Sequence, residues 1–518
     1  MNGTRRMLMN VAQPDLPAMI FKIDYTGVSN LNAFIVPVRG YSGTSVGAQT
    51  APYDWKIDYS LDNVTYTPLG TFTGTGSASA GISLSSTSVP TAGQYYLRIR
   101  PNSTPTFGWG KAFGFGTNNT GAGVLSNKQL LREVVEMPMN ACISTALYTG
   151  DFFNAYKYYG CTNLVIGEDT GSWWIIGPGN NFNAYKYYGC TSLLSGESVR
   201  MNTNPLNVYN FDLSKYAGCT SLVTPDETSN MTVSSITGTS VSTSFQQMKY
   251  FGCMSLVSPE NCTSWSFMLN ANTGMQYFHM AKYADCVNLQ TAENTSAWGV
   301  NGGAGSDFCY QKYYGCALIT QPEDTTEWRI TSATGQNFCY DKYHGCTSLL
   351  YPEHTAFWLF SSTTTAPESF GYSKYYGCTS LTAPEAVEGW TIAGRIGTMG
   401  AMKYYGCVNL TMPEGTYSWQ VHHDQGAGFC KQKYYGCTSL TEPEPFGNFY
   451  SVFALSVGTA ADWLCYQMYY VDTVDTIMKG YAVQIVNTLN GGNIPYATRM
   501  FANRTGLSDF ASLPANVK

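Results

Sequence analysis

A pattern of aromatic, lysine, glycine, cysteine and leucine positions recurs along most of the chain, as in KYYGCTSL at 374–381. Counted from each cysteine, Phe stands eight residues before it in nine of ten repeats, and Lys four before and Tyr three before in all ten. Leu stands three after in nine, an acid seven after in all ten, and a large apolar residue twelve after in nine. Such self-similarity predicts a stack of repeated units. The ten anchors, spaced by 29 to 34 residues, are Cys161, Cys190, Cys219, Cys253, Cys286, Cys316, Cys346, Cys378, Cys407 and Cys437.

The columns predict the elements of each unit. Phe, Lys and paired aromatics within eight residues, closed by Gly, indicate one or two helical turns that end at a left-handed residue. Alternation of period two in TEWRI (326–330), SWSFM (264–268) and GWTIA (389–393) indicates a short strand with one buried face. A unit this small cannot bury its apolar face alone, so neighbours must stack. The pattern therefore predicts an α/β solenoid of the leucine-rich-repeat type over 151–445, with one short helix and one short strand per repeat.

The ends of the chain lack this pattern. Residues 1–17 are predicted to form an N-terminal arm. Residues 18–105 hold alternating segments at 19–25, 32–38, 53–61, 81–85 and 95–101, separated by Gly, Ser, Asn and Pro, and predict a small all-β sandwich. Residues 106–150 are predicted to be a linker and N-terminal cap. After Cys437 the signature decays, with Val471-Asp472 where Gly-Cys belongs, so 446–518 is predicted to be a C-terminal cap or oligomer contact.

Composition narrows the class of protein. Charged residues make up 12% of the chain, against 52 glycines and 39 tyrosines, so the surface is polar mainly through Asn, Ser, Thr and Tyr, as is typical of an extracellular or virion protein. A net charge of −6 with 28 Lys+Arg makes nucleic acid an improbable partner. Neither a signal peptide nor an apolar run of about 20 residues is found, so we expect synthesis in the cytoplasm and no membrane insertion.

The repeated columns have structural interpretations that compete with functional ones. The anchor cysteines, beside Gly and Leu, are expected to be small buried residues. Bridges to Cys309, Cys339 or Cys430, seven residues before an anchor, are disfavoured because seven helical residues span about 10 Å. Zinc is unsupported, since no CxxC pair occurs.

The Lys and acid columns could form a charged binding stripe, but their invariance favours a ladder of ion pairs. The Trp column could be a sugar platform, but its period-two neighbours favour core.

No cofactor, metal site or catalytic residue is predicted. His422-His423-Asp424 is the densest group of potential metal ligands, but adjacent strand residues point to opposite faces, which favours a solvated loop. The remaining histidines, His279, His344 and His354, are scattered, and no nucleophile with an oriented base can be assembled from them.

Length varies between the repeats at one place, the connection that follows the strand. These connections span 176–181, 205–210, 234–244, 268–277, 301–307, 331–337, 361–369, 393–398 and 422–428. Such insertions map to one edge of a solenoid, often the binding edge, although unconstrained surface loops also vary. Their Gly, Asn, Ser and Thr content suits contacts with sugars or protein loops. The predicted binding residues there are Tyr209, Thr237, Thr239, Asn270, Asn272, Gln276, Asn301, Gln336, Thr364, Arg395, His422 and His423.

At Tyr313-Tyr314-Gly315-Cys316 and its copies the sequence resembles the BspA-like leucine-rich repeats, in which an aromatic, Gly-Cys and a following Leu mark each unit. The resemblance covers roughly 150–445. Two features depart from it, since Lys fills a position usually held by Ala or Met and the repeat is longer than the commonest unit. The 18–105 segment is similar to immunoglobulin-like or PKD-like modules. The resemblance implies a surface or phage protein with an adhesion role and no catalytic residues.

Three functional hypotheses follow from these observations. The first is a phage fibre or virion surface component that binds a host or neighbouring-cell surface glycan or protein, is attached to other virion or surface-assembly proteins through its N-terminal domain, and is possibly a homo-oligomer such as a trimer. The second is a bacterial adhesin or self-assembling surface subunit. The third, a glycan-active enzyme, requires a pair of carboxylates facing a cleft.

Overall fold

The structure is a computed structural model, and it divides into two compact units that are described separately. Unit 1 comprises Met1–Val233 and Met248–Leu256, and unit 2 comprises Ser234–Gln247 and Val257–Lys518. The described residues are 18–26, 53–74, 93–101, 128–136, 147–148, 154–171, 174–177, 180–198, 200–203, 210–233, 244–265, 276–298, 301–304, 306–333, 336–356, 358, 369–387, 398–416, 428, 430–444, 467–470, 500–507, 510–513, 515 and 518.

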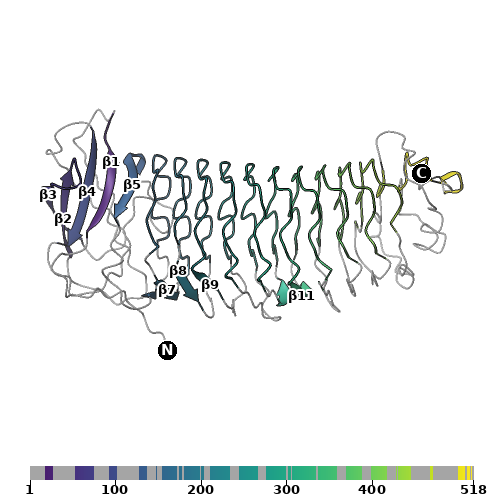
Figure 1. Cartoon of the computed structure of the whole chain (residues 1–518), viewed down its shortest axis with the longest axis horizontal. Helices are drawn as coiled ribbons and strands as arrows, with labels where there is room; N and C mark the ends of the chain where they lie inside the picture. Colours follow the sequence, from purple (N-terminus) through teal and green to yellow (C-terminus); the bar gives the residue numbers. More distant parts are fainter. Residues whose placement is uncertain are drawn as a thin grey trace. The chain divides into compact units, whose positions relative to one another are not determined.

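The alternating N-terminal segments form one antiparallel sheet in unit 1 (Figure 1). Its strands are β1 (Met19–Asp24), β2 (Tyr53–Ser60), β3 (Thr67–Gly74), β4 (Gln94–Pro101) and β5 (Leu131–Glu136), in the order β3-β2-β4-β1-β5. Phe21, Ile57 and Leu97 are buried. The predicted two-layer sandwich is therefore wrong for the described strands, which make a single sheet; the segments 32–38 and 81–85 lie outside the described residues.

Strand β5 joins this sheet to the first repeat. Val134 N–H donates to the Ile166 carbonyl at 3.0 Å, and Val165 N–H donates to the Arg132 carbonyl at 2.8 Å. Glu133 and Ile166 form a parallel bridge. Because an open edge of main-chain groups invites unwanted pairing, β5 protects the N-terminal edge of the repeats by pairing with it.

The segment predicted to be helical forms a run of tight turns in each repeat. Lys157 N–H donates to the Asn154 carbonyl at 3.3 Å, and Cys161 N–H donates to the Tyr158 carbonyl at 3.1 Å. Alternate N–H groups point to the next repeat instead, as from Tyr158 to the Lys186 carbonyl at 2.8 Å. Each repeat is thus one coil, which we call a rung, and rungs are joined by main-chain hydrogen bonds.

The α/β solenoid prediction is wrong, because the described residues contain no α-helix. A helix needs every residue at negative φ, but Asn154 (φ 59°), Tyr156 (57°) and Gly160 (68°) are left-handed. Left-handed backbone costs a non-glycine residue about 1–2 kcal/mol. The hydrogen bonds to the neighbouring rung offset this cost, and they are a tertiary interaction that local propensity does not contain.

Strands in the repeats are short, parallel and fewer than predicted among the described residues. In unit 1, β6 (Leu147–Tyr148), β7 (Trp174–Gly177), β8 (Arg200–Thr203) and β9 (Met231–Val233) form one parallel sheet, and in unit 2 β10 (Asn301–Ala304) pairs with β11 (Arg329–Ala333). Short 3-10 helices lie at η1 (Lys128–Leu130) and η4 (Phe510–Ser512). The strand predicted at 326–330 begins only at Arg329. Most of 264–268 and all of 389–393 lie outside the described residues.

The stack continues beyond the last anchor cysteine. The Tyr469 ring stacks between Tyr434, at 5.4 Å, and Phe501, at 5.0 Å. Arg504 occupies the cysteine position of the final rung, and its buried guanidinium donates to the carbonyls of Tyr469 at 2.8 Å and Cys437 at 2.6 Å. The sequence pattern missed this rung because Phe, Asn and Arg replace Tyr, Gly and Cys.

The position before the anchor cysteine offers a test of the left-handed backbone. Asp285 has φ 62° where the other nine repeats have Gly. We expect Asp285→Gly to raise the free energy of unfolding by roughly 0.5 kcal/mol, because relief of left-handed strain exceeds the added chain entropy of glycine. The reverse change, Gly345→Asp at φ 75°, is expected to lower it. Urea unfolding measures both changes. If the two substitutions change the free energy of unfolding in the same direction, left-handed strain at this position does not explain the effect.

Candidate functional site

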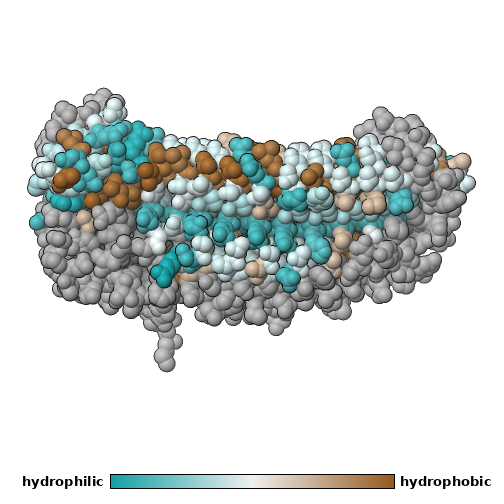
Figure 2. All heavy atoms as spheres, viewed as in Figure 1, coloured by the Kyte–Doolittle hydropathy of each residue, from teal (hydrophilic) through white to brown (hydrophobic). Residues whose placement is uncertain are grey.

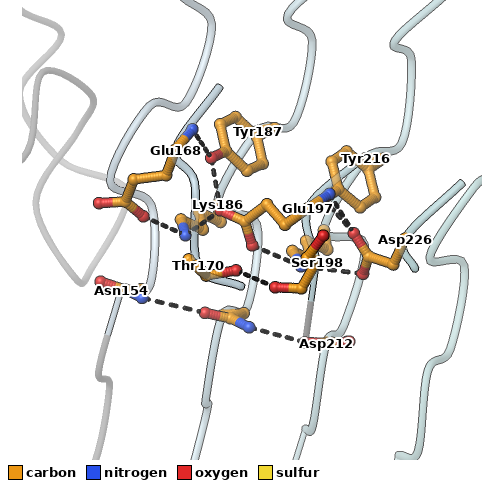
Figure 3. Close-up of polar contacts among 12 residues, drawn as sticks. Asn154, Glu168, Thr170, Lys186, Tyr187, Glu197, Ser198, Asp212, Tyr216 and Asp226 are labelled. Atoms are coloured by element: carbon orange, nitrogen blue, oxygen red, sulfur yellow. Dashed lines mark hydrogen bonds and ion pairs between the residues drawn. The ribbon is translucent and has the colours of Figure 1, made fainter. Parts of the chain in front are cut away.

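The lysine and acid columns lie inside the rungs and alternate in a buried ion ladder (Figure 3). In unit 1, Lys186 contacts Glu168 of the preceding rung and Glu197 of its own. Lys215 Nζ lies 2.8 Å from Glu197 and 2.9 Å from Asp226. Each internal lysine therefore lies between two carboxylates, and the hypothesis of ion pairing between rungs is confirmed over that of a surface stripe.

Unit 2 repeats the arrangement, since each of its column lysines contacts the acid of its own rung and that of the preceding one. The pairs are Lys282 with Glu260 and Glu293, Lys312 with Glu293 and Glu323, Lys342 with Glu323 and Glu353, Lys374 with Glu353 and Glu385, Lys403 with Glu385 and Glu414, and Lys433 with Glu414 and Glu444. Such alternation gives each of these described lysines a partner of opposite sign on both sides, which is the condition for burying charge in a row.

The tyrosine column completes the ladder with hydrogen bonds. Tyr187 Oη donates to Glu197 at 2.6 Å and accepts from the Glu168 N–H at 2.9 Å, so the phenol joins two rungs (Figure 3). The rings also stack, at 5.2 Å between Tyr158 and Tyr187 and 5.3 Å between Tyr187 and Tyr216. The invariance of Tyr in this column follows from both contacts, because Phe would lose the hydroxyl and Ser would lose the ring.

The ends of the ladder differ electrostatically from its interior. Burial raises the pKa of Glu168, but two neighbouring lysines outweigh burial and hold that pKa at about 2. Burial lowers the pKa of Lys157, which contacts Glu168 of its own rung. Burial raises the pKa of Glu444, which contacts Lys433. Two lysines thus outweigh burial at Glu168, whereas at Lys157 and Glu444 burial has the larger effect.

The tryptophan column is core in the described rungs. Trp265, Trp298, Trp328 and Trp358 are all fully buried and stack at 5.9 to 6.3 Å. The interpretation of these rings as core is confirmed, since none of the four can contact a sugar. Their faces instead receive the column lysines, as with Lys342 Nζ at 5.4 Å from the Trp328 centroid.

The anchor cysteines are buried free thiols, as predicted. All fourteen described cysteines are buried and unbridged; Cys142 and Cys465 lie outside the described residues. Anchor thiols donate to the tyrosine carbonyl of the preceding rung, as from Cys346 to Tyr313 at 3.2 Å. Cys309 and Cys339 are also buried and free, and burial raises the pKa of the Cys309 thiol to about 12. These environments hold the protonated, unreactive form.

The thiols give a direct chemical prediction. In the folded protein we expect the buried cysteines to resist a thiol reagent for as long as the rungs stay closed, because the thiolate is the reactive species. In denaturant without reductant, most of the sixteen cysteines are expected to react. Counting modified thiols by mass spectrometry measures both states. Extra thiols released by reductant would contradict the assignment of free cysteines.

One group of potential metal ligands lies in unit 2, within the ladder. Donor atoms of Glu260, Cys262 and Glu293 lie within 4.8 Å of one another and are buried. Lys282 contacts both carboxylates, so the position that a cation would fill already holds an ammonium group. Burial also raises the pKa of the Cys262 thiol well above its usual range. The group therefore fits its place in the ladder better than a metal site.

A small, partly open cavity lies beside the ladder in unit 1. Its volume is about 10 Å³, and Asn154, Asn183, Lys186 and Glu197 are among its lining residues. A cavity of this size accommodates one water molecule at most. It therefore does not offer a substrate pocket.

Most of the predicted binding residues lie outside the described residues. Three are described: Gln276 is half-buried, Asn301 lies in β10, and Gln336 is exposed. The Gln336 carbonyl accepts from the Asp307 N–H at 2.8 Å, so its main chain joins two rungs. The others are Tyr209, Thr237, Thr239, Asn270, Asn272, Thr364, Arg395, His422 and His423. Binding at the variable edge stays a prediction.

An uncharged surface that the sequence analysis did not single out runs over the rungs of each unit. It comprises the exposed and half-buried side chains from two residues before each anchor cysteine to four after it, without the buried cysteine and leucine, and we call it the tyrosine–threonine face. Over ten repeats these positions contain one charged residue, Asp285. Tyr is frequent at the first position, Thr directly after the cysteine, and Val, Leu or Thr at the last. The same column counting that exposed the core contained this signal.

Half-buried aromatic rings stack along this face. In unit 2, His344 lies 4.7 Å from Tyr314 and 4.4 Å from Tyr376. The row continues from Tyr376 to Tyr405 at 4.6 Å and from Tyr405 to Tyr435 at 4.5 Å. Each interior ring is covered on both faces by its neighbours, so the row presents ring edges and hydroxyl groups to solvent.

Comparison with family models, curated proteins and solved structures found no match. No helix in the described part of the chain is long and apolar enough to cross a membrane.

Proposed function

We propose that this protein is a non-enzymatic structural and recognition protein, in which the stacked rungs are a rigid scaffold for binding surfaces. One observation carries the proposal. The repeated lysine, acid, tyrosine and cysteine side chains are buried inside the rungs, where they form ion pairs and hydrogen bonds. A catalytic group needs access to substrate and a tunable proton, but these groups are buried and paired. Variation in length between the repeats is confined to the connections that follow the strands.

The partner that we propose is a glycan or protein on a host or neighbouring-cell surface. An abundance of Tyr, Ser, Thr and Asn with few charges is typical of surfaces that bind neutral polar partners. The resemblance to BspA-like repeats supports an adhesion role, and with the charge-poor composition it favours a phage fibre or virion surface component. A bacterial adhesin or self-assembling surface subunit is the alternative. Both place the protein on a virion or an extracellular surface.

Replacing two variable connections tests recognition. Segments 234–244 and 268–277 would be exchanged for Gly/Ser linkers of equal length, with an equal exchange of 176–181, a connection that holds none of the predicted binding residues, as the matched control. Full-length protein and variants would be assayed on a glycan array and by pull-down with cell envelopes. Loss of binding with either exchange alone, at an unchanged unfolding temperature, is expected. Binding to neither array nor envelope by the unmodified chain would contradict the recognition role.

The two origins are separated by a different observation. Co-purification of the protein with virions, and capsid or tail genes beside its own, are expected for the fibre hypothesis. Recovery with the cell envelope beside a secretion operon would instead favour the adhesin.

A further inference from the structure

We propose that the tyrosine–threonine face binds a second copy of this chain, so that two stacks of rungs pack side by side. This goes beyond recognition by the variable connections, because it assigns a partner to a different surface. Four observations support it: the lack of charge, the exposed apolar side chains, the stacking of the aromatic rings, and the repeat distance of the rungs.

The lack of charge matters because the chain as a whole carries −6. Two copies repel each other where like charges meet, so a neutral contact surface favours their association. The face provides such a surface, since Asp285 is its single charged side chain in ten repeats. Interface cores are depleted of charge and enriched in aromatic residues in the same way.

Aliphatic side chains on this face and at its border are unusually exposed. In unit 1, Leu194 (49%) and Val223 (42%) follow each other on successive rungs, with Ile166 (49%) just beyond the first rung's last face position. In unit 2, Val287 (41%) and Leu350 (38%) are on the face as well. Figure 2 shows apolar residues in a row along the upper part of the rungs in this view. The successive exposed aliphatic side chains of unit 1 form an apolar patch, and such patches are typical of interaction surfaces.

The aromatic row argues against a sugar as the occupant. A sugar ring stacks on the open face of an aromatic ring, but the faces of Tyr376 and Tyr405 are covered by their neighbours at 4.4 to 4.6 Å. Ring edges and hydroxyl groups remain, and these pack against other ring edges, methyl groups and hydroxyls. The same face of a second copy presents all three.

The repeat distance favours a second copy over an unrelated protein. Main-chain hydrogen bonds such as Tyr343 N–H to the Lys374 carbonyl, at 2.9 Å, fix the spacing between rungs. A partner that matches every rung must repeat at that spacing, and another copy does so by construction. In unit 2 the face runs over six rungs, from Cys286 to Cys437. At roughly 4.8 Å per rung and about 20 Å of width it covers on the order of 600 Å², the lower end of the roughly 600–1,000 Å² per partner of stable interfaces.

Analytical ultracentrifugation of the full chain over a range of concentrations tests the inference. We expect a concentration-dependent dimer or larger assembly. The double variant Val223→Lys with Val287→Lys places a charge on the face of each unit, and is expected to weaken self-association at least tenfold through like-charge repulsion. The matched control is Asn230→Lys with Ala297→Lys, which adds the same charge to the same two rungs at exposed positions outside the face. It is expected to leave association unchanged.

Three outcomes would overturn the inference. One is a monomer at every concentration, and another is an assembly that both double variants weaken equally. The third is that parent and face variant are both monomeric but the face variant loses binding to the glycan array or envelope. The face would then bind that partner and not a second copy, and the proposed function would remain supported. If the lysine variant lowers the unfolding temperature, Val223→Gln with Val287→Gln replaces it, since glutamine removes apolar contact without adding charge.

Discussion

Replacing Lys342 by Met is expected to lower the free energy of unfolding by about 3–5 kcal/mol, because it removes one charge from a buried alternating row. Lys342 Nζ lies 2.8 Å from Glu323 and 2.5 Å from Glu353, and no part of the lysine is exposed. Without it, two carboxylates each keep a single lysine and the interior gains an uncompensated negative charge. Urea unfolding followed by circular dichroism measures the loss.

A double variant separates charge from packing. Adding Glu353→Gln to Lys342→Met removes the uncompensated charge while keeping similar volumes, so it is expected to recover most of the lost stability. Replacement of buried ion pairs by neutral residues is often tolerated in this way. If the double variant is less stable than the single one, loss of packing or hydrogen bonds explains the effect and charge imbalance does not.

Acid is expected to unfold the rungs cooperatively between about pH 4.5 and pH 2. Paired lysines hold the pKa values of Glu168 and Glu414 at about 2, below the usual value of about 4.3 for an unfolded chain. A carboxyl whose pKa is depressed by folding stabilises the protein above its unfolded pKa, and that stability is lost as pH falls through the folded pKa. Several acids contribute to one ladder, so the loss is expected to be steep.

The lysines determine the loss of stability at high pH. Neighbouring carboxylates raise the pKa of Lys215 and Lys433 against the effect of burial. Their stabilisation is complete below about pH 10.4, the usual lysine pKa, and is lost as pH rises further. Melting temperatures from pH 2 to pH 11 measure both limits. A melting temperature that stays constant from pH 5 to pH 2 would contradict a buried, ionised ladder.

The sequence was sufficient to predict the interior of the rungs. A lysine at the position of Lys342 and an acid at the position of Glu353 occur in every repeat, although the connections vary in length. The invariance of both charges indicated ion pairing between neighbouring repeats. Trp328 and Cys346 were assigned to the core by similar reasoning, and both are buried. These assignments succeeded because stacking brings equivalent residues of neighbouring rungs into contact. A residue type that is the same in every repeat therefore indicates a position where the equivalent residues touch.

The same sequence led to the wrong local structure. Aromatic residues, lysine and a closing glycine are compatible with a short helix, and nothing local excludes it. In the structure Tyr156 and Gln311 have left-handed backbones, at φ 57° and 52°, although neither type favours that conformation. Their N–H groups bond to the neighbouring rung at 2.9 Å in both cases. Single-residue preferences cannot reveal a conformation that only the next rung stabilises.

By itself, the sequence determined which residues repeat, which of them are buried, and that oppositely charged columns pair. Only the tertiary structure decided that the frame is a series of turns, that one N-terminal sheet protects the first rung through β5, and that Arg504 ends the stack in place of cysteine. The physical reason is the range of the interactions. The same residue types appear in the sequence of every repeat and can be read there. The hydrogen bonds between rungs form only when the rungs are stacked, so the sequence of one repeat does not show them.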